Sequence, residues 1–285
     1  MADTLILDSP AKVNLRLEIL GKREDGYHEI RTIFQKISLC DTLHFSLMRK
    51  RGIYISTDNP SLPAGEKNLA YRAAEMLFDR SDYKGGISIE IQKRIPLGAG
   101  LGGGSSNAAT TLKALNLLLK TGLSRKELME IGLQIGADVP FFLMKGAAIG
   151  TGIGENLEKV EIPHLWFLLI NPKFEVSTRW AYQNFVLTKK RFHYNIHKLL
   201  ESPSKISRIL RNDLEEVVAT AYPQINKMKE VLSSVGAEGV LMTGSGPTVF
   251  GVFPNGKRAL EAFRKMKNEA KREGWIVLKT QSITD

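Results

Sequence analysis

Alternating apolar and polar positions predict strands in the first half of the chain. Segment 11–20 alternates throughout, with an apolar face of Val13, Leu15, Leu17 and Ile19 and a polar face of Lys12, Asn14, Arg16 and Glu18. Pro10 is expected to mark the start of this strand. Segments 30–39, 43–47, 52–56 and 87–91 predict further strands.

Helical periodicity and capping signals predict most of the remaining elements. Apolar residues at helical spacing predict helices over 68–78 and 108–119, and a capping box at Ser124 and Glu127 begins another that runs to Ile135. In the second half, helices are expected over 177–185, 207–221, 223–235 and 258–274, and strands over 166–170, 239–253 and 275–282. This alternation predicts helices stacked on one antiparallel sheet, with a domain boundary that separates 1–158 from 159–285.

The central motif is a glycine-rich stretch between a predicted strand and a predicted helix. It has five glycines in seven residues and ends in two serines: Pro96, Leu97, Gly98, Ala99, Gly100, Leu101, Gly102, Gly103, Gly104, Ser105 and Ser106. Glycines let backbone N–H groups turn toward a ligand, and a helix start attracts anions. We predict a phosphate cradle in which Ser105 or Ser106 caps the helix; the alternative is a plain strand-to-helix turn.

Three better-known phosphate motifs do not fit this stretch. A dinucleotide fingerprint needs an acidic residue about 20 positions further on, after a second strand. That region here is the helix end at Leu118 to Gly122. No Gly-Lys-Ser/Thr closes the loop, and the motif set of protein kinases is absent from the sequence. The phosphate is therefore held by another architecture.

Composition describes an ordinary soluble protein. The 285 residues are 43% hydrophobic and carry a formal charge of +10, but the basic residues are scattered without interleaved aromatics. We therefore expect them on a solvated surface and predict no nucleic-acid partner. No apolar run is long enough for a membrane span, and no signal peptide is evident. The single cysteine, Cys40, is expected in a strand or the core, and a cytoplasmic location is predicted.

Some polar residues admit both a structural and a chemical interpretation. Asp138, before Pro140, could cap a short helix or act as a general base. Lys12 could be an exposed strand lysine or a phosphate ligand. His193 and His197 have helical metal-ligand spacing, but no third ligand is near them in sequence, and we assign no metal.

Three motifs in fixed order resemble the GHMP family of small-molecule kinases. They are Pro10 to Leu15, the glycine-rich stretch, and Thr243-Gly-Ser-Gly-Pro-Thr248. The resemblance covers nearly the whole chain. It implies an α+β two-domain fold, with an ATP-binding N-terminal domain of the ribosomal-S5-domain-2-like type and a ferredoxin-like C-terminal domain. Asp25 to Glu29 and Gly136 to Pro140 further resemble members whose substrate is a cytidine-diphosphate-linked methylerythritol.

The resemblance also implies roles for individual residues. It implies that the glycine-rich stretch binds ATP with Mg²⁺, and that Gly244 to Gly246 supports the phosphate site. Asp138 is expected to be the general base, and Lys12 to neutralise the transferred phosphoryl group. Asn14 and Thr178 are expected to contact substrate. Tyr27 and His28 are expected at the cytosine, with Tyr182 as a second ring; Trp180 and Phe185 are its competitors.

Two other functions remain open. One is a GHMP kinase that acts on homoserine or a mevalonate-like alcohol, against which Gly26-Tyr27-His28 argues. The other is an RNA-binding S5-like protein without catalysis, which the net charge allows. Lys12, Asp138 and the triple glycine argue against that interpretation.

Overall fold

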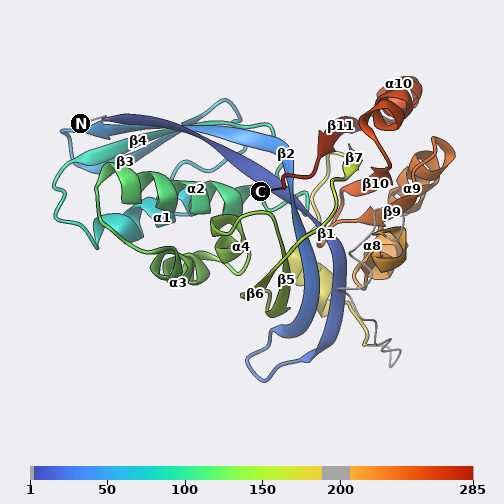
Figure 1. Cartoon of the computed structure of the whole chain (residues 1–285), viewed down its shortest axis with the longest axis horizontal. Coiled ribbons are helices and arrows are strands. Elements are labelled where there is room, and N and C mark those ends of the chain that lie inside the picture. The colour runs from blue at the N-terminus through green and yellow to red at the C-terminus, as the bar shows by residue number, and fades with distance from the viewer. Residues whose placement is uncertain (1–2, 188–205, 285) are drawn as a thin grey trace. The chain divides into compact units, whose positions relative to one another are not determined.

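The computed structural model describes residues 3–187 and 206–284, and the chain divides into two compact units (Figure 1). Unit 1 consists of Met1–Ala11, Leu39–Leu97 and Gly102–Lys145, and unit 2 of Lys12–Ser38, Gly98–Leu101 and Gly146–Asp285. The chain therefore passes between the units several times. The predicted sequence domains 1–158 and 159–285 stay a prediction. His193 and His197 lie outside the described residues.

Unit 1 combines strands with four helices. Strand β4 (Gly86–Gln92) pairs antiparallel with the C-terminal half of β2 (His28–Met48) and parallel with β3 (Gly52–Thr57). The helices are α1 (Leu69–Phe78), α2 (Gly103–Leu118), α3 (Arg125–Ile135) and α4 (Val139–Leu143). Asn68, expected as the first residue of its helix, is the N-cap of α1. The predicted capping box of Ser124 and Glu127 begins α3, so this signal placed that helix start correctly.

The first two strands are longer than the sequence pattern predicts. Strand β1 runs over Thr4–Lys22, so Pro10 lies inside it and does not mark its start. Strand β8 (Arg211–Asn212) pairs with β1 at Arg16 and Leu17 alone, which leaves the edge at Pro10 free of that partner. A proline, which lacks an N–H donor, is tolerated at such an edge. Strand β2 is one continuous strand where two were expected.

The polar face of β1 is buried, although alternation of this kind usually indicates a solvated face. The side chains of Lys12, Asn14, Arg16 and Glu18 all lie in the interior. Arg16 contacts Glu18 at 2.6 Å, and Arg31 contacts the other oxygen of Glu18 at 2.8 Å. Burial acts to raise the pKa of Glu18, but the hydrogen bonds and charges of the two arginines outweigh it and lower that pKa.

Unit 2 contains an antiparallel sheet in the order β11-β7-β10-β9. Its strands are β7 (Trp166–Asn171), β9 (Gly239–Met242), β10 (Val249–Phe253) and β11 (Ile276–Gln281). Helices α5 (Thr178–Gln183), α7 (Ile206–Ile209), α8 (Glu215–Ala221) and α9 (Gln224–Ser234) lie between β7 and β9 in the chain, and α10 (Gly256–Glu273) lies between β10 and β11. This is the predicted ferredoxin-like order.

Another part of unit 2 is a set of strands that includes the N-terminal half of β2. Strand β5 (Ala147–Gly152) pairs antiparallel with Ile30 to Gln35 of β2 and with β6 (Asn156–Val160). The expected helix over 207–221 is wrong, because β8 interrupts it. Asn212 accepts the nearby backbone N–H of Leu214, which competes with helix formation, and Asn212 and Asp213 also bind the backbone of Met242 and Ile19, far away in the chain.

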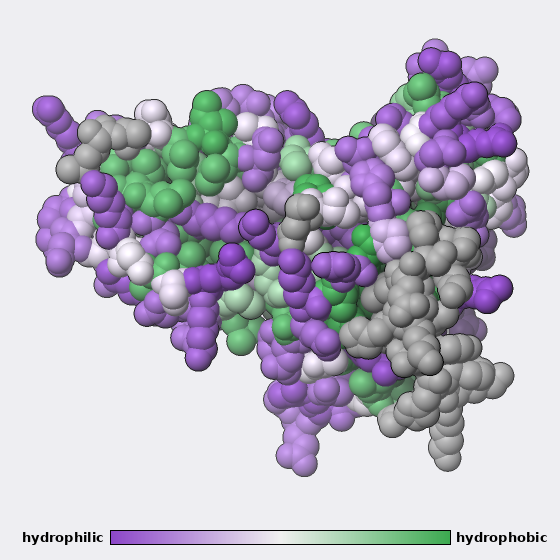
Figure 2. Space-filling view, viewed as in Figure 1, coloured by the Kyte–Doolittle hydropathy of each residue, from purple (hydrophilic) through white to green (hydrophobic). Residues whose placement is uncertain are grey.

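The basic residues of α10 (Gly256–Glu273) lie on an exposed face, as predicted. Helix α10 buries Ala259, Ala262, Met266 and Ala270, and Figure 2 shows a mostly hydrophilic surface over it. Cys40 is half-buried in β2, and mainly its burial raises the pKa of its thiol to about 11. Within residues 3–187 and 206–284, no helix is both long and apolar enough to cross a membrane.

Candidate active site

The glycine-rich stretch forms the loop between β4 and α2. Gly98, Gly100 and Gly102 adopt φ values of +56°, +74° and +70°, which favour glycine. Gly102 is the N-cap of α2, and the helix begins at Gly103. The expected serine cap is therefore wrong, because Ser105 and Ser106 lie inside the first helical turn and not at the N-cap position.

The first part of this loop, in unit 2, packs tightly against a second glycine turn. A Cβ on Gly100 would lie 2.2 Å from the carbonyl oxygen of Thr243, so only glycine fits there. Ala99 and Leu101 are buried and anchor the loop, whereas Gly98 is exposed and Pro96 and Leu97 are half-buried. The side chains of Ala99 and Leu101 thus lie in the core, and the loop presents its backbone between them.

Lys12 and Asn14 lie beside this part of the loop. The backbone N–H of Lys12 donates to the carbonyl of Leu101 at 3.0 Å, and the Lys12 ammonium donates to Oδ1 of Asn14. Asn14 in turn donates through Nδ2 to the Thr32 hydroxyl at 2.7 Å. Lys12 is 4% exposed, so its charge is held in place by its neighbours and is not the charge of an exposed surface lysine.

The turn from Thr243 to Gly246 joins these elements. The Thr243 hydroxyl accepts the backbone N–H of Asn14 at 2.9 Å, and the Ser245 hydroxyl lies 2.9 Å from that of Thr178. Gly244 has a φ of +58°, and a Cβ there would lie 3.0 Å from the carbonyl oxygen of Gly100. This turn therefore contacts Asn14, the glycine loop and Thr178, three predicted parts of the site.

The second part of the loop, in unit 1, begins α2. Gly103 and Gly104 precede Ser105, and the first N–H groups of a helix have no partner within it. Ser106 is fully buried, and its hydroxyl accepts a hydrogen bond from Ser9 at 2.8 Å. Ser105 is half-buried, and a Cβ on Gly136 would lie 4.0 Å from its hydroxyl oxygen. Ser105 is therefore the better placed of the two serines for a ligand.

Asp138 stands directly before α4 in unit 1. It occupies the N-cap position and Pro140 the first turn, as predicted, but the Asp138 side chain makes no capping bond. Its side chain is half-buried. The Asp138 carboxylate therefore does not cap α4, which was the structural alternative to a catalytic role.

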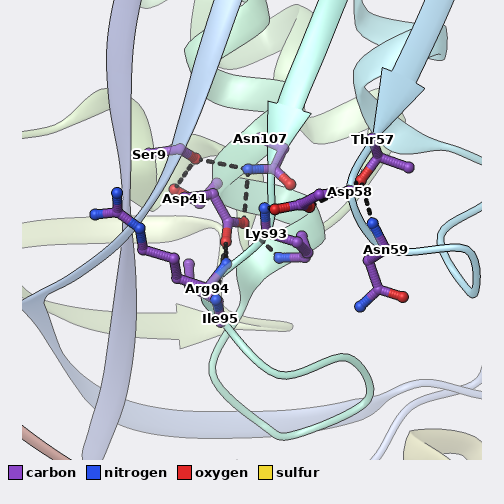
Figure 3. Close-up of polar contacts among 10 residues, drawn as sticks. Ser9, Asp41, Thr57, Asp58, Asn59, Lys93, Arg94, Ile95 and Asn107 are labelled. Atoms are coloured by element: carbon purple, nitrogen blue, oxygen red, sulfur yellow. Dashed lines mark hydrogen bonds and ion pairs between the residues drawn. The ribbon is translucent and has the colours of Figure 1, made fainter.

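A buried carboxylate holds the base of the loop in unit 1 (Figure 3). Asp41 is fully buried and accepts the backbone N–H groups of Arg94 and Ile95 at 2.8 Å each. It also accepts the amide of Asn107 at 3.0 Å and forms an ion pair with Lys93. Burial lowers the pKa of Lys93, and Asp41 opposes this shift. Asp41 thus connects β2, the end of β4 and the first turns of α2.

Two aromatic rings meet at another part of unit 2. His28 and Tyr182 have ring centroids 5.3 Å apart and planes inclined by 32°. Tyr27 is 61% exposed, while Trp180 packs edge-on against Tyr222. Phe185 packs against the hydrophobic core of unit 2. Burial chiefly lowers the pKa of His28, with help from Lys22, so its imidazole is neutral at pH 7 and can both donate and accept.

Several residues of this framework carried no signal in the sequence. Asp41, Asn107 and Thr32 lie in or beside segments whose pattern predicts only a strand or a helix. Their roles depend on partners far away in the chain, which spacing does not reveal. Among the described residues, no three His, Cys, Asp or Glu side chains group closely enough to hold a metal ion.

We predict that Gly100→Ala disturbs the loop more than a glycine change without neighbours. Gly236→Ala is the matched control, because Gly236 has φ +93° and nothing within 4 Å of its would-be Cβ. The control should lose about 1 kcal/mol of unfolding free energy from backbone strain alone. Gly100→Ala should lose more in urea denaturation; equal losses would contradict the close approach to Thr243.

We also predict that Asp41→Ala strongly destabilises the protein. It leaves the buried Lys93 ammonium without its partner, and breaking a buried ion pair in this way costs about 3–5 kcal/mol. The control is Asp58→Ala, which removes an exposed acceptor of the Lys93 backbone N–H and of the Thr57 hydroxyl. Urea denaturation measures both, and a loss at Asp41 no larger than at Asp58 would refute this role.

Comparison with known proteins places this arrangement in a family. The model for the GHMP kinases N terminal domain matches residues 68–146, and that for the GHMP kinases C terminal matches residues 194–272. A 4-diphosphocytidyl-2-C-methyl-D-erythritol kinase of Syntrophotalea carbinolica is 45% identical over 97% of this chain and 98% of its own. One of Syntrophus aciditrophicus is 48% identical over 96% and 98%.

Solved structures agree with these relatives. A crystal structure titled 4-(cytidine 5'-diphospho)-2C-methyl-D-erythritol kinase has a TM-score of 0.85 and 33% identity, and it covers 99% of this chain and 100% of that one. A homoserine kinase from Cytophaga hutchinsonii shares the fold with a TM-score of 0.77 at 22% identity, covering 100% and 96%. By near-full-length similarity and by the two matched domains, the chain belongs to the GHMP kinase family.

Proposed function

We propose that this protein is an ATP-dependent kinase that phosphorylates the 2-hydroxyl of 4-diphosphocytidyl-2-C-methyl-D-erythritol, in non-mevalonate isoprenoid biosynthesis. The observation that carries this proposal is the identity of 45–48% over nearly the whole chain to relatives with that name. The two aromatic rings of unit 2 and the glycine loop supply matching chemistry for a cytosine base and for phosphates.

The donor side of the reaction is assigned to the loop from Pro96 to Ser106. The positive φ values of Gly98, Gly100 and Gly102 suit the phosphates of ATP, as do the N–H groups at the start of α2 that have no partner within the helix. Mg²⁺ bound to these phosphates would neutralise charge on them. Since no acidic cluster for a metal occurs in the described residues, we assign the ion to the ATP phosphates, with the half-buried Ser105 as the serine assigned to help place it.

The acceptor side is assigned to residues of unit 2. Tyr182 and the exposed Tyr27 would offer the cytosine ring faces to stack on, beside the His28 imidazole. A neutral His28 offers both a donor and an acceptor to the edge of the base. Asn14 and Thr178 are assigned to the methylerythritol part. Both lie against the turn from Thr243 to Gly246, which keeps them in fixed positions.

The chemical step needs one base and one fixed positive charge. Asp138 is assigned as the base that takes the proton from the substrate hydroxyl, whose oxygen then bonds to the γ-phosphorus as the bond to ADP breaks. Lys12 is assigned to the charge that develops on the transferred phosphoryl group. Its burial and its contact with Asn14 keep the ammonium in one orientation, which suits this role.

Other functions receive less support. A homoserine or mevalonate type of GHMP kinase would share the fold, but the relatives at 45–48% identity are named 4-diphosphocytidyl-2-C-methyl-D-erythritol kinase. An RNA-binding protein would not need a buried Lys12 beside a glycine loop. We expect a small-molecule partner, no nucleic-acid or membrane partner, and a cytoplasmic location.

Thermal stabilisation by separate ligands tests the assignment. We expect CDP and ATP with Mg²⁺ each to raise Tm, because each should bind the folded state alone; a ligand at 100 times its Kd adds about 2.7 kcal/mol. Homoserine and mevalonate serve as controls and should produce no shift. A shift with either of them, and none with CDP, would reject the proposed substrate.

Mutation of the proposed base tests the chemistry. Asp138→Asn should lower kcat by a factor of about 10² to 10⁴ while the CDP-induced Tm shift stays unchanged, because the carboxylate acts on the hydroxyl alone. The side chain does not cap α4, so the change removes no helix cap. Asp82→Asn, an exposed acid in unit 1, is the control. Turnover by Asp138→Asn within a few-fold of the unmodified enzyme would exclude Asp138 as the base.

A further inference from the structure

The segment Asn212-Asp213-Leu214-Glu215 binds the backbone of the turn that contacts the proposed site. Asn212 donates through Nδ2 to the carbonyls of Met242 and Gly244, both at 2.8 Å. Glu215 accepts the backbone N–H of Met242 at 2.7 Å. Side chains from this one short segment therefore satisfy both backbone groups of Met242 and the carbonyl two residues further on.

These bonds take the place of a neighbouring strand. Strand β9 is the edge strand of its sheet, paired on one side with β10, where Met242 faces Val249. Backbone groups on the other side of an edge strand need other partners when they are buried. Met242 is fully buried, and Asn212 and Glu215 provide those partners. The turn that follows Met242 thus starts from a backbone fixed on both sides.

The same segment is also fixed to β1, the strand that carries Lys12 and Asn14. The backbone N–H of Asp213 donates to the carbonyl of Leu17 at 2.9 Å, and the Asp213 carboxylate accepts the N–H of Ile19 at 2.8 Å. Asn212 pairs with Leu17 in the parallel register of β8 and β1. The segment therefore connects β1 with the turn from Thr243 to Gly246.

We propose that Asn212 is a positioning residue for phosphoryl transfer, which acts by holding the turn from Thr243 to Gly246 against Asn14, Gly100 and Thr178. The inference rests on the proposed function. Asn212 is 7% exposed, and its Oδ1 accepts the N–H of Leu214 at 3.0 Å. The amide is thereby oriented with its NH₂ group toward the turn. A shift of the turn moves Gly100 and Asn14 together, because Thr243 contacts both.

The test compares Asn212→Asp with Asn255→Ala. The carboxylate of the first variant would keep the shape of the side chain but could not donate to either carbonyl. Asn255 caps α10 in the same unit. It lies after the C-terminal end of β10, whereas the turn lies before the N-terminal end. Asn255→Ala therefore gives a matched loss of stability without a change at the site. Asn255→Ala should lower Tm by about 2–4 °C and leave kcat unaltered.

We expect Asn212→Asp to lower kcat about 10- to 100-fold, the effect of a small misplacement of reacting groups. The CDP-induced Tm shift should change much less than kcat, because the proposed cytosine residues His28 and Tyr182 are not in the turn, which bonds α5 at Thr178, one helical turn before Tyr182. Asn212→Ala, which removes the donor without adding charge, should behave alike and covers the case in which the aspartate variant does not fold. Hydrogen exchange of residues 242–246 should accelerate in both variants and not in Asn255→Ala.

Three outcomes would overturn the inference. They are a kcat within threefold of the unmodified enzyme, unchanged exchange at residues 242–246, or a loss of CDP binding in proportion to the loss of kcat, which would show general destabilisation. The failure of the proposed function is seen separately. In that case the unmodified enzyme does not turn over the cytidine substrate, while the exchange experiment still reports whether Asn212 holds the turn.

Discussion

The close approach of Gly100 to the carbonyl of Thr243 is the constraint on which unit 2 depends most. At so close an approach a Cβ is not accommodated at Gly100 or Gly244, and both residues have left-handed backbone, so both positions favour glycine. The contact also fixes Asn14, because Thr243 accepts its N–H. Through Asn14 it fixes the Lys12 ammonium as well. Three motifs that are far apart in the chain therefore meet at Thr243, whose carbonyl packs against Gly100 and whose hydroxyl binds Asn14.

Unit 1 solves a similar problem with a buried charge. The end of β4 and the start of α2 must be held so that the loop between them keeps its shape. Asp41 does this with two backbone N–H groups, an amide and an ammonium, which together satisfy a carboxylate that is fully buried. The loop is thus anchored by a carboxylate in unit 1 and by backbone packing in unit 2.

The aromatic residues of α5 and its C-terminal end show how far spacing alone can place a ring. Spacing made Tyr182, Trp180 and Phe185 competitors for the second ring at the cytosine. In the structure all three pack against the core of unit 2, but Trp180 also meets Tyr222 edge-on and Tyr182 lies beside His28. Helical spacing defines a face of α5, but the elements that pack on that face decide which of the rings meets His28.

Local patterns in the sequence were enough to predict the order of most elements and the residues of the glycine motifs, and the resemblance of those motifs to the GHMP family supplied the α+β two-domain fold. The elements and motifs follow from local preferences: alternation, helical periodicity, capping residues and glycines at turns. Tertiary contacts determined what those preferences do not contain. They buried the polar face of β1, interrupted the helix expected over 207–221, moved the cap of α2 to Gly102 and gave Asp41 and Asn212 their partners. Each of these depends on contacts between residues far apart in the chain, whose free energy outweighs the local preference.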